Sequence, residues 1–186
     1  VRIYGAIGGV PAYLDKWDAA KSFKDNICRL VLTPSGALYG EADAVISAEL
    51  RELSAYSTIL AAIARGENKL NDIFHATGFS RAKISVYLKN LATFNIVEKV
   101  VSFETGGWEN AKKGVYQIKD TFVNFWFKFV YPNMSNLYLL SPEEFYDTYI
   151  EKELDAYLER YFREVCTEYL LILNQMGQLP FTIKRV

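Results

Sequence analysis

Between Tyr56 and Thr93, apolar residues recur at the spacing of one helical face in three successive short runs. The runs are Ile59, Leu60 and Ile63, then Leu70, Ile73 and Phe74, then Ile84, Leu88 and Leu91. Each run would form the buried stripe of one helix, because positions three and four apart lie on the same side. Gly78 would supply the tight turn before the third helix, and Ser80 would cap that helix. The pattern predicts a helix-turn-helix.

Two β-prone runs follow the third predicted helix and would pair as a hairpin. Residues 96–103 alternate around β-branched residues, and residues 114–118 have similar strand-like content. The loop between them contains Gly106, Gly107, Trp108, Lys112 and Lys113. Three helices followed by a hairpin are the order of a winged helix-turn-helix, which presents its third helix to a groove of nucleic acid.

The third predicted helix supplies most of the candidate DNA-binding residues. If its apolar stripe faces inward, Arg81, Ser85 and Lys89 share the opposite face at i, i+4 and i+8. The full candidate set is Arg81, Lys83, Ser85 and Lys89 on the helix, with Lys112 and Lys113 on the wing. The wing would lie against the phosphate backbone or the minor groove. An ordinary solvated face, and a hairpin tip with Trp108 folded onto the body, are the competing interpretations.

Helical patterns flank this unit on both sides. Before it, Pro11 suits the first turn of a helix, and a break at residues 33–36 precedes a further helix near residues 43–53. After it, Asp120 would cap a helix dense in aromatic residues, whose apolar surface favours burial over a platform for stacking bases. Its aromatic residues are Phe122, Phe125, Trp126, Phe127, Phe129 and Tyr131.

Pro142 would open another helix, and a long helix is expected from about residue 149 to residue 173. Its apolar stripe comprises Leu154, Leu158, Tyr161, Phe162, Val165 and Tyr169. The elements together predict a mainly α fold with a small β wing, in which a winged helix-turn-helix is flanked by helical segments. The expected division is residues 1–54, 55–119 and 120–186.

Charge is distributed unevenly over these segments. The chain of 186 residues has a net charge of −1, which gives no overall attraction to phosphate. Residues 66–119 contain eight basic and five acidic side chains, a balance of +3, whereas residues 120–186 have a balance of −4. The only positive third of the chain therefore coincides with the helix-turn-helix, which favours an anionic partner such as double-stranded DNA.

The composition argues against several other classes of protein. Cys28 and Cys166 lie far apart and form no CxxC pair, so reduced thiols in a cytoplasmic protein are favoured over a disulfide. No apolar run is long enough for a membrane span, and no leader is evident. The chain has neither a GxxxxGK[ST] loop nor a metal-binding spacing, and its single histidine, His75, suits a structural or surface role. No catalytic residue, metal site or cofactor is expected within the chain.

Several runs together resemble one family, the archaeal-type P-loop ATPases of the AAA+/STAND group. They are Ile7-Gly-Gly-Val-Pro-Ala-Tyr-Leu14, Leu38-Tyr-Gly-Glu41, Ile59-Leu-Ala-Ala-Ile-Ala-Arg-Gly66, Tyr87-Leu-Lys-Asn-Leu91 and Phe125-Trp-Phe-Lys-Phe-Val-Tyr-Pro-Asn133. The resemblance covers nearly the whole chain in matching order. It implies that residues 1–54 are the remnant of a helical ATPase lid, 55–119 the winged helix, and 120–186 the start of a domain similar to PD-(D/E)XK nucleases.

The resemblance also implies where nucleotide would bind. The family's lid has a Gly-x-Pro beside the adenine, and Gly9-Val10-Pro11 matches it, so Gly9 and Pro11 would contact nucleotide in the full-length protein. ATP and Mg would be cofactors of that protein, which is expected to be an ATPase whose own ATPase domain contacts this chain. The family often has Phe-Glu in the first nuclease-like helix, where this chain has Phe162-Arg163. The resemblance also implies that the catalytic acid-and-lysine strand would lie beyond residue 186, so nuclease activity is not expected of this chain.

Two functions from different classes fit these patterns. The first is a winged-helix module that binds double-stranded DNA within an ATP-driven protein. The second is an interaction scaffold, in which the winged helix separates two domains or contacts a protein partner. A third possibility is a part of an ATP-dependent nuclease that acts only in the intact chain.

Overall fold

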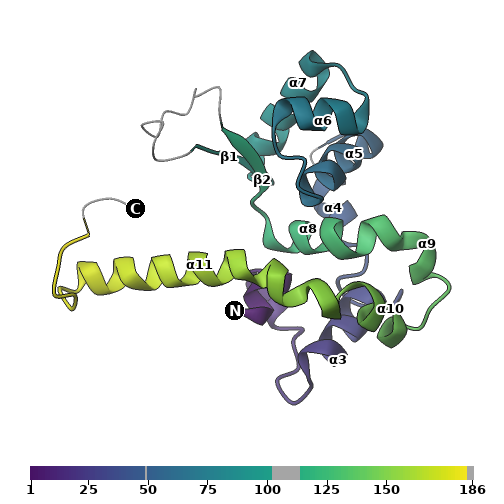
Figure 1. The fold of residues 1–186 in the computed structure, drawn as a ribbon. Coiled ribbons are helices and arrows are strands. Elements are labelled where there is room, and N and C mark those ends of the chain that lie inside the picture. Colours follow the sequence, from purple (N-terminus) through teal and green to yellow (C-terminus); the bar gives the residue numbers. More distant parts are fainter. Residues whose placement is uncertain (49, 102–113, 184–186) are drawn as a thin grey trace.

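The computed structural model describes residues 1–48, 50–101 and 114–183. Figure 1 shows a largely helical chain in two lobes, with one small antiparallel sheet among the described residues. The predicted fold class, mainly α with a small β wing, is confirmed. The upper lobe in Figure 1 contains α5, α6, α7, β1 and β2, and the lower lobe contains the other helices apart from α4, which lies between them.

The elements before the sheet are helices and one π-helical turn. They are α1 (Arg2–Ile7), α2 (Pro11–Leu14), α3 (Phe23–Ile27), the π-helical turn η1 (Cys28–Leu32), α4 (Glu41–Ser47), α5 (Leu53–Ala64), α6 (Leu70–Thr77) and α7 (Arg81–Thr93). The sheet consists of β1 (Val97–Val100) and β2 (Val115–Ile118). The remaining elements are α8 (Thr121–Phe125), the π-helical turn η3 (Trp126–Val130), the 3-10 turn η4 (Tyr131–Asn133), α9 (Met134–Leu137), α10 (Pro142–Tyr149) and α11 (Glu151–Gln175).

Local signals set the boundaries of the central helices. Gly78 ends α6 with a left-handed backbone (φ 70°), which costs glycine nothing because it has no Cβ. The Ser80 hydroxyl then accepts a hydrogen bond from the Lys83 amide at 3.2 Å and so caps α7. The inward stripe of α7 is buried as expected, with Ile84, Leu88 and Leu91 each at most 2% exposed. These predictions are confirmed.

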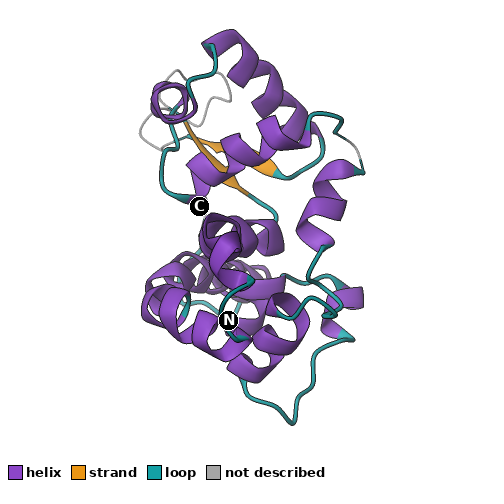
Figure 2. Cartoon of the chain, turned by 90° about the vertical axis from the view of Figure 1, so that its right-hand side faces the viewer, coloured by secondary structure: helices purple, strands orange, loops and turns teal. Residues whose placement is uncertain are grey.

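The two-stranded sheet follows α7 in the chain, and its second strand leads into α8 of the lower lobe. Val97 pairs with Ile118 and Val100 with Val115 in antiparallel register. Figure 2 shows both strands in the upper lobe, beside the helices that precede them. The hairpin tip, including Gly106, Gly107, Trp108, Lys112 and Lys113, lies outside the described residues. The order of three helices and a hairpin is therefore present, and the predictions for the tip stay predictions.

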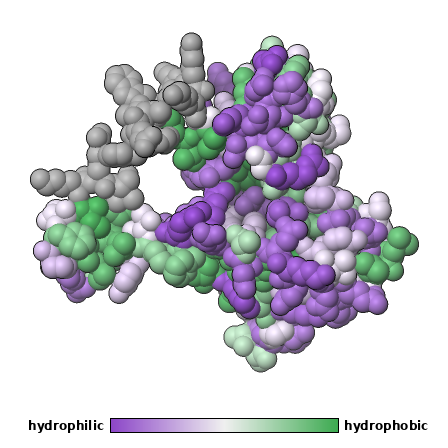
Figure 3. Space-filling view, in the orientation of Figure 1, coloured by the Kyte–Doolittle hydropathy of each residue, from purple (hydrophilic) through white to green (hydrophobic). Residues whose placement is uncertain are grey.

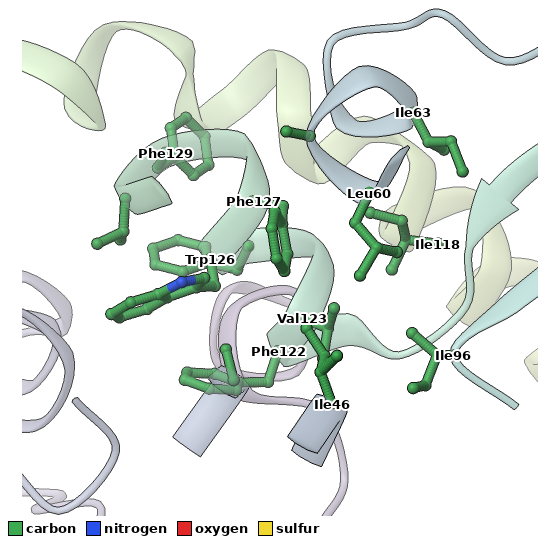
Figure 4. Close-up of a cluster of buried hydrophobic side chains, with 14 of the residues drawn as sticks. Ile46, Leu60, Ile63, Ile96, Ile118, Phe122, Val123, Trp126, Phe127 and Phe129 are labelled. Atoms are coloured by element: carbon green, nitrogen blue, oxygen red, sulfur yellow. The ribbon is translucent and has the colours of Figure 1, made fainter. Parts of the chain in front are cut away.

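The aromatic segment formed by α8 and η3 connects the two lobes. Phe122, Phe125, Trp126, Phe127 and Phe129 are each at most 2% exposed, so the prediction of burial is confirmed. Figure 4 shows Phe127 near Leu60 and Ile118 of the upper lobe, whereas Trp126 and Phe122 lie on the other side of the helix. Burying aromatic side chains of this size stabilises the fold by about 1.5–3 kcal/mol each. The segment is thus a shared core and not a surface for bases.

The first and last helices pack against each other in the lower lobe. The hydroxyl of the half-buried Tyr157 of α11 donates to the Gly5 carbonyl of α1 at 2.9 Å, and Asn124 of α8 donates to the Tyr161 hydroxyl at 2.7 Å. A Cβ at Gly5 would lie 2.3 Å from a methyl carbon of Leu158. Contacts therefore join residues 1–54 to residues 120–186, and the expected three-part division stays a prediction.

Only part of α11 rests on the body. Leu154, Leu158 and Tyr161 are buried, but Phe162 and Tyr169, which belong to the same predicted stripe, are 57% and 60% exposed. Figure 3 shows apolar surface on the protruding end of this helix. Within the described residues, we find no helix that combines the length and apolar character needed to span a bilayer.

Candidate nucleic-acid interface

The outward side of α7 is open to solvent. Arg81, Ser85 and Lys89 are all exposed, and none of them is covered by α10 or α11. The buried positions, which include Tyr87 as well as the predicted stripe, shift the centre of the outward side toward Val86. The exposed residues along this side are Ala82, Ser85, Val86, Lys89 and Thr93, and we call them the outer face of α7.

Arg81 lies at the edge of the outer face, where α6 holds its side chain. The guanidinium carbon is 4.0 Å from the centre of the Phe74 ring, and a guanidinium nitrogen donates to the Asn71 side-chain carbonyl. A cation over an aromatic ring is stabilised by about 0.5–1 kcal/mol at an exposed site. Arg81 is therefore pre-oriented at the start of α7, and other N–H donors of its guanidinium remain accessible.

Lys83 points away from the outer face. Its ammonium lies 3.7 Å from a Glu52 carboxylate oxygen, and it also sits over the Phe79 ring at 4.6 Å. The Tyr87 hydroxyl donates to the same carboxylate, which, together with burial, raises the pKa of Tyr87 to about 12. Lys83 thus ties α7 to the segment before α5, and a carboxylate neutralises its charge. The structure does not bring Lys83 together with Ser85 and Lys89.

The described part of the wing has mixed charge. Lys99 of β1 lies over the Tyr116 ring at 5.8 Å, and Glu98 accepts a hydrogen bond from Gln117 at 2.6 Å. Arg160 of α11 approaches Glu98 at 3.9 Å and pairs with Glu164 at 2.7 Å. Glu98 and Arg160 connect the base of the wing to the lower lobe. Lys112 and Lys113 lie outside the described residues.

Sequence reasoning missed the residues that hold the cations. Asn71 and Phe74 occur three positions apart on α6, so they share a face, and this spacing was the available signal. Nothing in the local sequence points to the pairing of Glu52 with Lys83, because the two belong to different elements. The same is true of Glu98 and Arg160.

Gly9 and Pro11 are exposed at the junction of α1 and α2, on the surface of the lower lobe. A shallow cavity of about 230 Å³ lies beside Gly9. It is bounded by Asn95, between α7 and β1, by Lys119, just after β2, and by Phe122 of α8. The Tyr13 hydroxyl donates to Glu41 at 2.8 Å, and burial together with this carboxylate raises the pKa of Tyr13. The segments 7–14 and 38–41 are therefore in contact with each other.

The single histidine and both cysteines of the chain lie within the described residues. That part of the chain contains no group of three or more histidine, cysteine or carboxylate side chains placed to hold a metal ion. His75 is exposed and lies against the edge of the Phe74 ring, as a surface residue would. Cys28 is buried, Cys166 is half-buried, and both are free thiols.

By its described elements the chain is a mainly helical protein that contains three helices (α5, α6 and α7) followed by a two-stranded antiparallel sheet (β1 and β2). Its residues 126–186 match the model of the DUF234 family, described as archaea bacterial proteins of unknown function. Along its whole length the chain is 33% identical, over 187 aligned residues, to an uncharacterized protein of Methanocaldococcus jannaschii. The chain spans 41% of that relative's length. No solved structure matches the chain.

Proposed function

We propose that this chain is a DNA-binding winged-helix module of a larger ATP-binding protein, and that α7 and the wing contact a duplex. The observation that supports this most directly is the exposed side of α7, where Ser85 and Lys89 lie free of the lower lobe and Arg81 is fixed beside them. A recognition helix needs such an open side to enter the major groove. The balance of +3 in residues 66–119 supports an anionic partner.

The proposal predicts modest affinity with a defined salt dependence. Each neutralised phosphate contributes roughly −0.9 to the slope of log affinity against log salt, so contacts from Arg81 and Lys89 give a slope of roughly −2. Any contacts from the wing tip would steepen it. Anisotropy of a labelled duplex, titrated at several salt concentrations, measures both the affinity and the slope.

Charge reversal on α7 tests the assigned surface. Arg81→Glu combined with Lys89→Glu should abolish binding at moderate salt, because two attractive contacts become repulsive. Lys21→Glu combined with Lys152→Glu is the matched control, since both lysines are exposed in the lower lobe and two charges are again reversed. Absence of binding by the unmodified chain even at low salt would refute the proposal, as would equal losses in the test and control variants.

A protein-contact role is the second candidate. Val86 is 57% exposed at the centre of the outer face, and a protein partner could cover it. The connection of the wing base to α11 through Glu98 and Arg160 would suit a rigid spacer between domains. Val86→Asp should then disrupt the complex between this chain and its partner, with no duplex bound under any salt condition.

The ATP-binding part of the proposal rests on the resemblance to the lid of P-loop ATPases. Gly9 and Pro11 offer an exposed backbone that a base could approach, but the described residues contain no group of three or more carboxylate, histidine or cysteine side chains that could hold Mg. Those ligands would come from the ATPase domain of the full-length protein. A Cβ at Gly9 would come no closer than 4.0 Å to its nearest neighbour, Tyr4. Gly9→Ala should therefore leave the fold intact, and weaker ATP binding by the full-length variant would support the contact.

A further inference from the structure

The outer face of α7 has an apolar centre. Ala82, Val86, Lys89 and Thr93 follow one another at i, i+4, i+7 and i+11, so they form a single stripe along the helix. Val86 is 57% exposed in the middle of that stripe. If this side of α7 faces a groove, the side chain at its centre is the branched apolar one of Val86, and the cations lie beside it.

The polar side chains of the outer face have few donors left for a ligand. The Ser85 hydroxyl donates to the Arg81 carbonyl at 2.8 Å, and the Thr93 hydroxyl donates to the Lys89 carbonyl at 3.0 Å. Beside them, the Asn90 amide donates to the Tyr56 hydroxyl at 2.8 Å. Because these hydroxyls turn back to their own helix, they keep only accepting capacity, and Lys89 remains as the donor of the outer face among the described residues.

This combination fits one feature of the major groove. Thymine carries a C5 methyl group there, which side chains contact through apolar atoms, whereas guanine is usually recognised by the paired donors of arginine. Val86 and the Thr93 methyl match the thymine methyl in chemistry, and Ser85 or Thr93 oxygen can accept from adenine N6. Arg81 and Lys89 flank them and can hold phosphates.

We propose that the outer face of α7 recognises A·T pairs, and that Val86 determines this specificity by contacting thymine methyl groups in the major groove. The inference rests on the proposed DNA-binding function. Arg81 and Lys89 then supply affinity that does not depend on sequence, while Val86 supplies the discrimination.

Two duplexes of identical alternating A·T sequence test the inference, one containing thymine and the other deoxyuridine. They differ only in the C5 methyl groups. The unmodified chain should bind the thymine duplex about fourfold more tightly for each methyl contacted, the factor that corresponds to burying one CH₂-sized group. Anisotropy at low salt gives both dissociation constants.

Val86→Ala should lower the ratio of the two affinities about fourfold for each methyl that Val86 contacts, and should bind the deoxyuridine duplex as the unmodified chain does. Val86 is exposed and alanine favours helices, so this variant keeps the fold. Val165→Ala on α11, also a partly exposed valine, is the matched control and should keep the original ratio.

The possible outcomes distinguish a failure of the inferred A·T recognition from a failure of the proposed DNA-binding function. If the unmodified chain binds both duplexes equally, the inferred recognition of thymine methyl groups is wrong, but the proposed DNA binding stands. A ratio that persists in Val86→Ala overturns the role of Val86. Binding of neither duplex overturns the inference and the proposed function together, and leaves the protein-contact role.

Discussion

Helices α7 and α11 both carry an apolar stripe, but they use it differently. The stripe of α7 is buried along its whole length, with Ile84 and Leu91 inaccessible to solvent. The stripe of α11 is buried at Leu154 and Leu158 and then exposed from Phe162 onward. Figure 1 shows the reason, since α7 lies against α5, α6 and the sheet, whereas the second half of α11 extends beyond the lower lobe.

The comparison shows that periodicity identifies a stripe without showing what covers it. Both helices have the spacing of an amphipathic helix, and the same spacing places Tyr161 inside and Tyr169 outside. Coverage depends on the neighbouring elements, which lie far away in sequence. Along α7 the partners are present, and the remaining side is free for a ligand. Along α11 the partners end after two or three turns.

The largest expected effect comes from truncating the buried half of the α11 stripe. Leu154→Ala should lower the free energy of unfolding by about 2–5 kcal/mol, because it removes a side chain that is 2% exposed and leaves a cavity. Leu170→Ala, the same change in the same helix at a position 43% exposed, should change it by about 0.5 kcal/mol or less. Urea unfolding of both variants measures the difference.

Equal costs at Leu154 and Leu170 would break the comparison between the two halves of α11. Such a result would mean that the protruding half is packed in solution against another chain or another copy. Unfolding measured at two protein concentrations would then show a midpoint that rises with concentration.

The sequence predicted the features that depend on neighbours in the chain. The tight turn at Gly78, the Ser80 cap, the aromatic core and the inward stripe of α7 all follow from local geometry and apolar spacing. The positions of the charged groups were not predictable in this way. The structure places Arg81 on Phe74 and Lys83 against Glu52, and both contacts require the packing of separate elements.

The start of α7 gives the next effect in size. Ser80→Ala should destabilise the fold by about 1 kcal/mol, because the Lys83 amide loses its side-chain acceptor at the first turn. Ser80→Asp should retain most of the stability, since aspartate is an equally good cap. Thermal unfolding of the two variants distinguishes the cap from a simple loss of surface contact. A loss in both variants of the same size would exclude the capping explanation.

A smaller effect is expected for single cations of α7. Lys89→Ala should weaken duplex binding a few-fold and reduce the salt slope by about 0.9, the contribution of one phosphate contact. Lys83→Ala should leave both quantities unchanged, because its ammonium is directed at Glu52 and lies off the outer face. The pair is matched in chemistry and lies on the same helix. Equal effects from the two variants would show that Lys83 leaves Glu52 when DNA binds.

The smallest effect concerns the ionisation of Tyr87 on the inner side of α7. Its bond to Glu52 holds the pKa near 12, above the ordinary value of 10.0, because the neutral hydroxyl donates to a carboxylate. The folded state therefore favours the neutral phenol, and this contribution is complete below about pH 10 and is lost as the pH rises toward 12. The difference in ultraviolet titration between the unmodified chain and Tyr87→Phe isolates this tyrosine. When Tyr87→Phe is introduced into Glu52→Gln, the titration difference between the two variants should appear at lower pH. An unchanged midpoint would show that burial, and not the carboxylate, holds the proton.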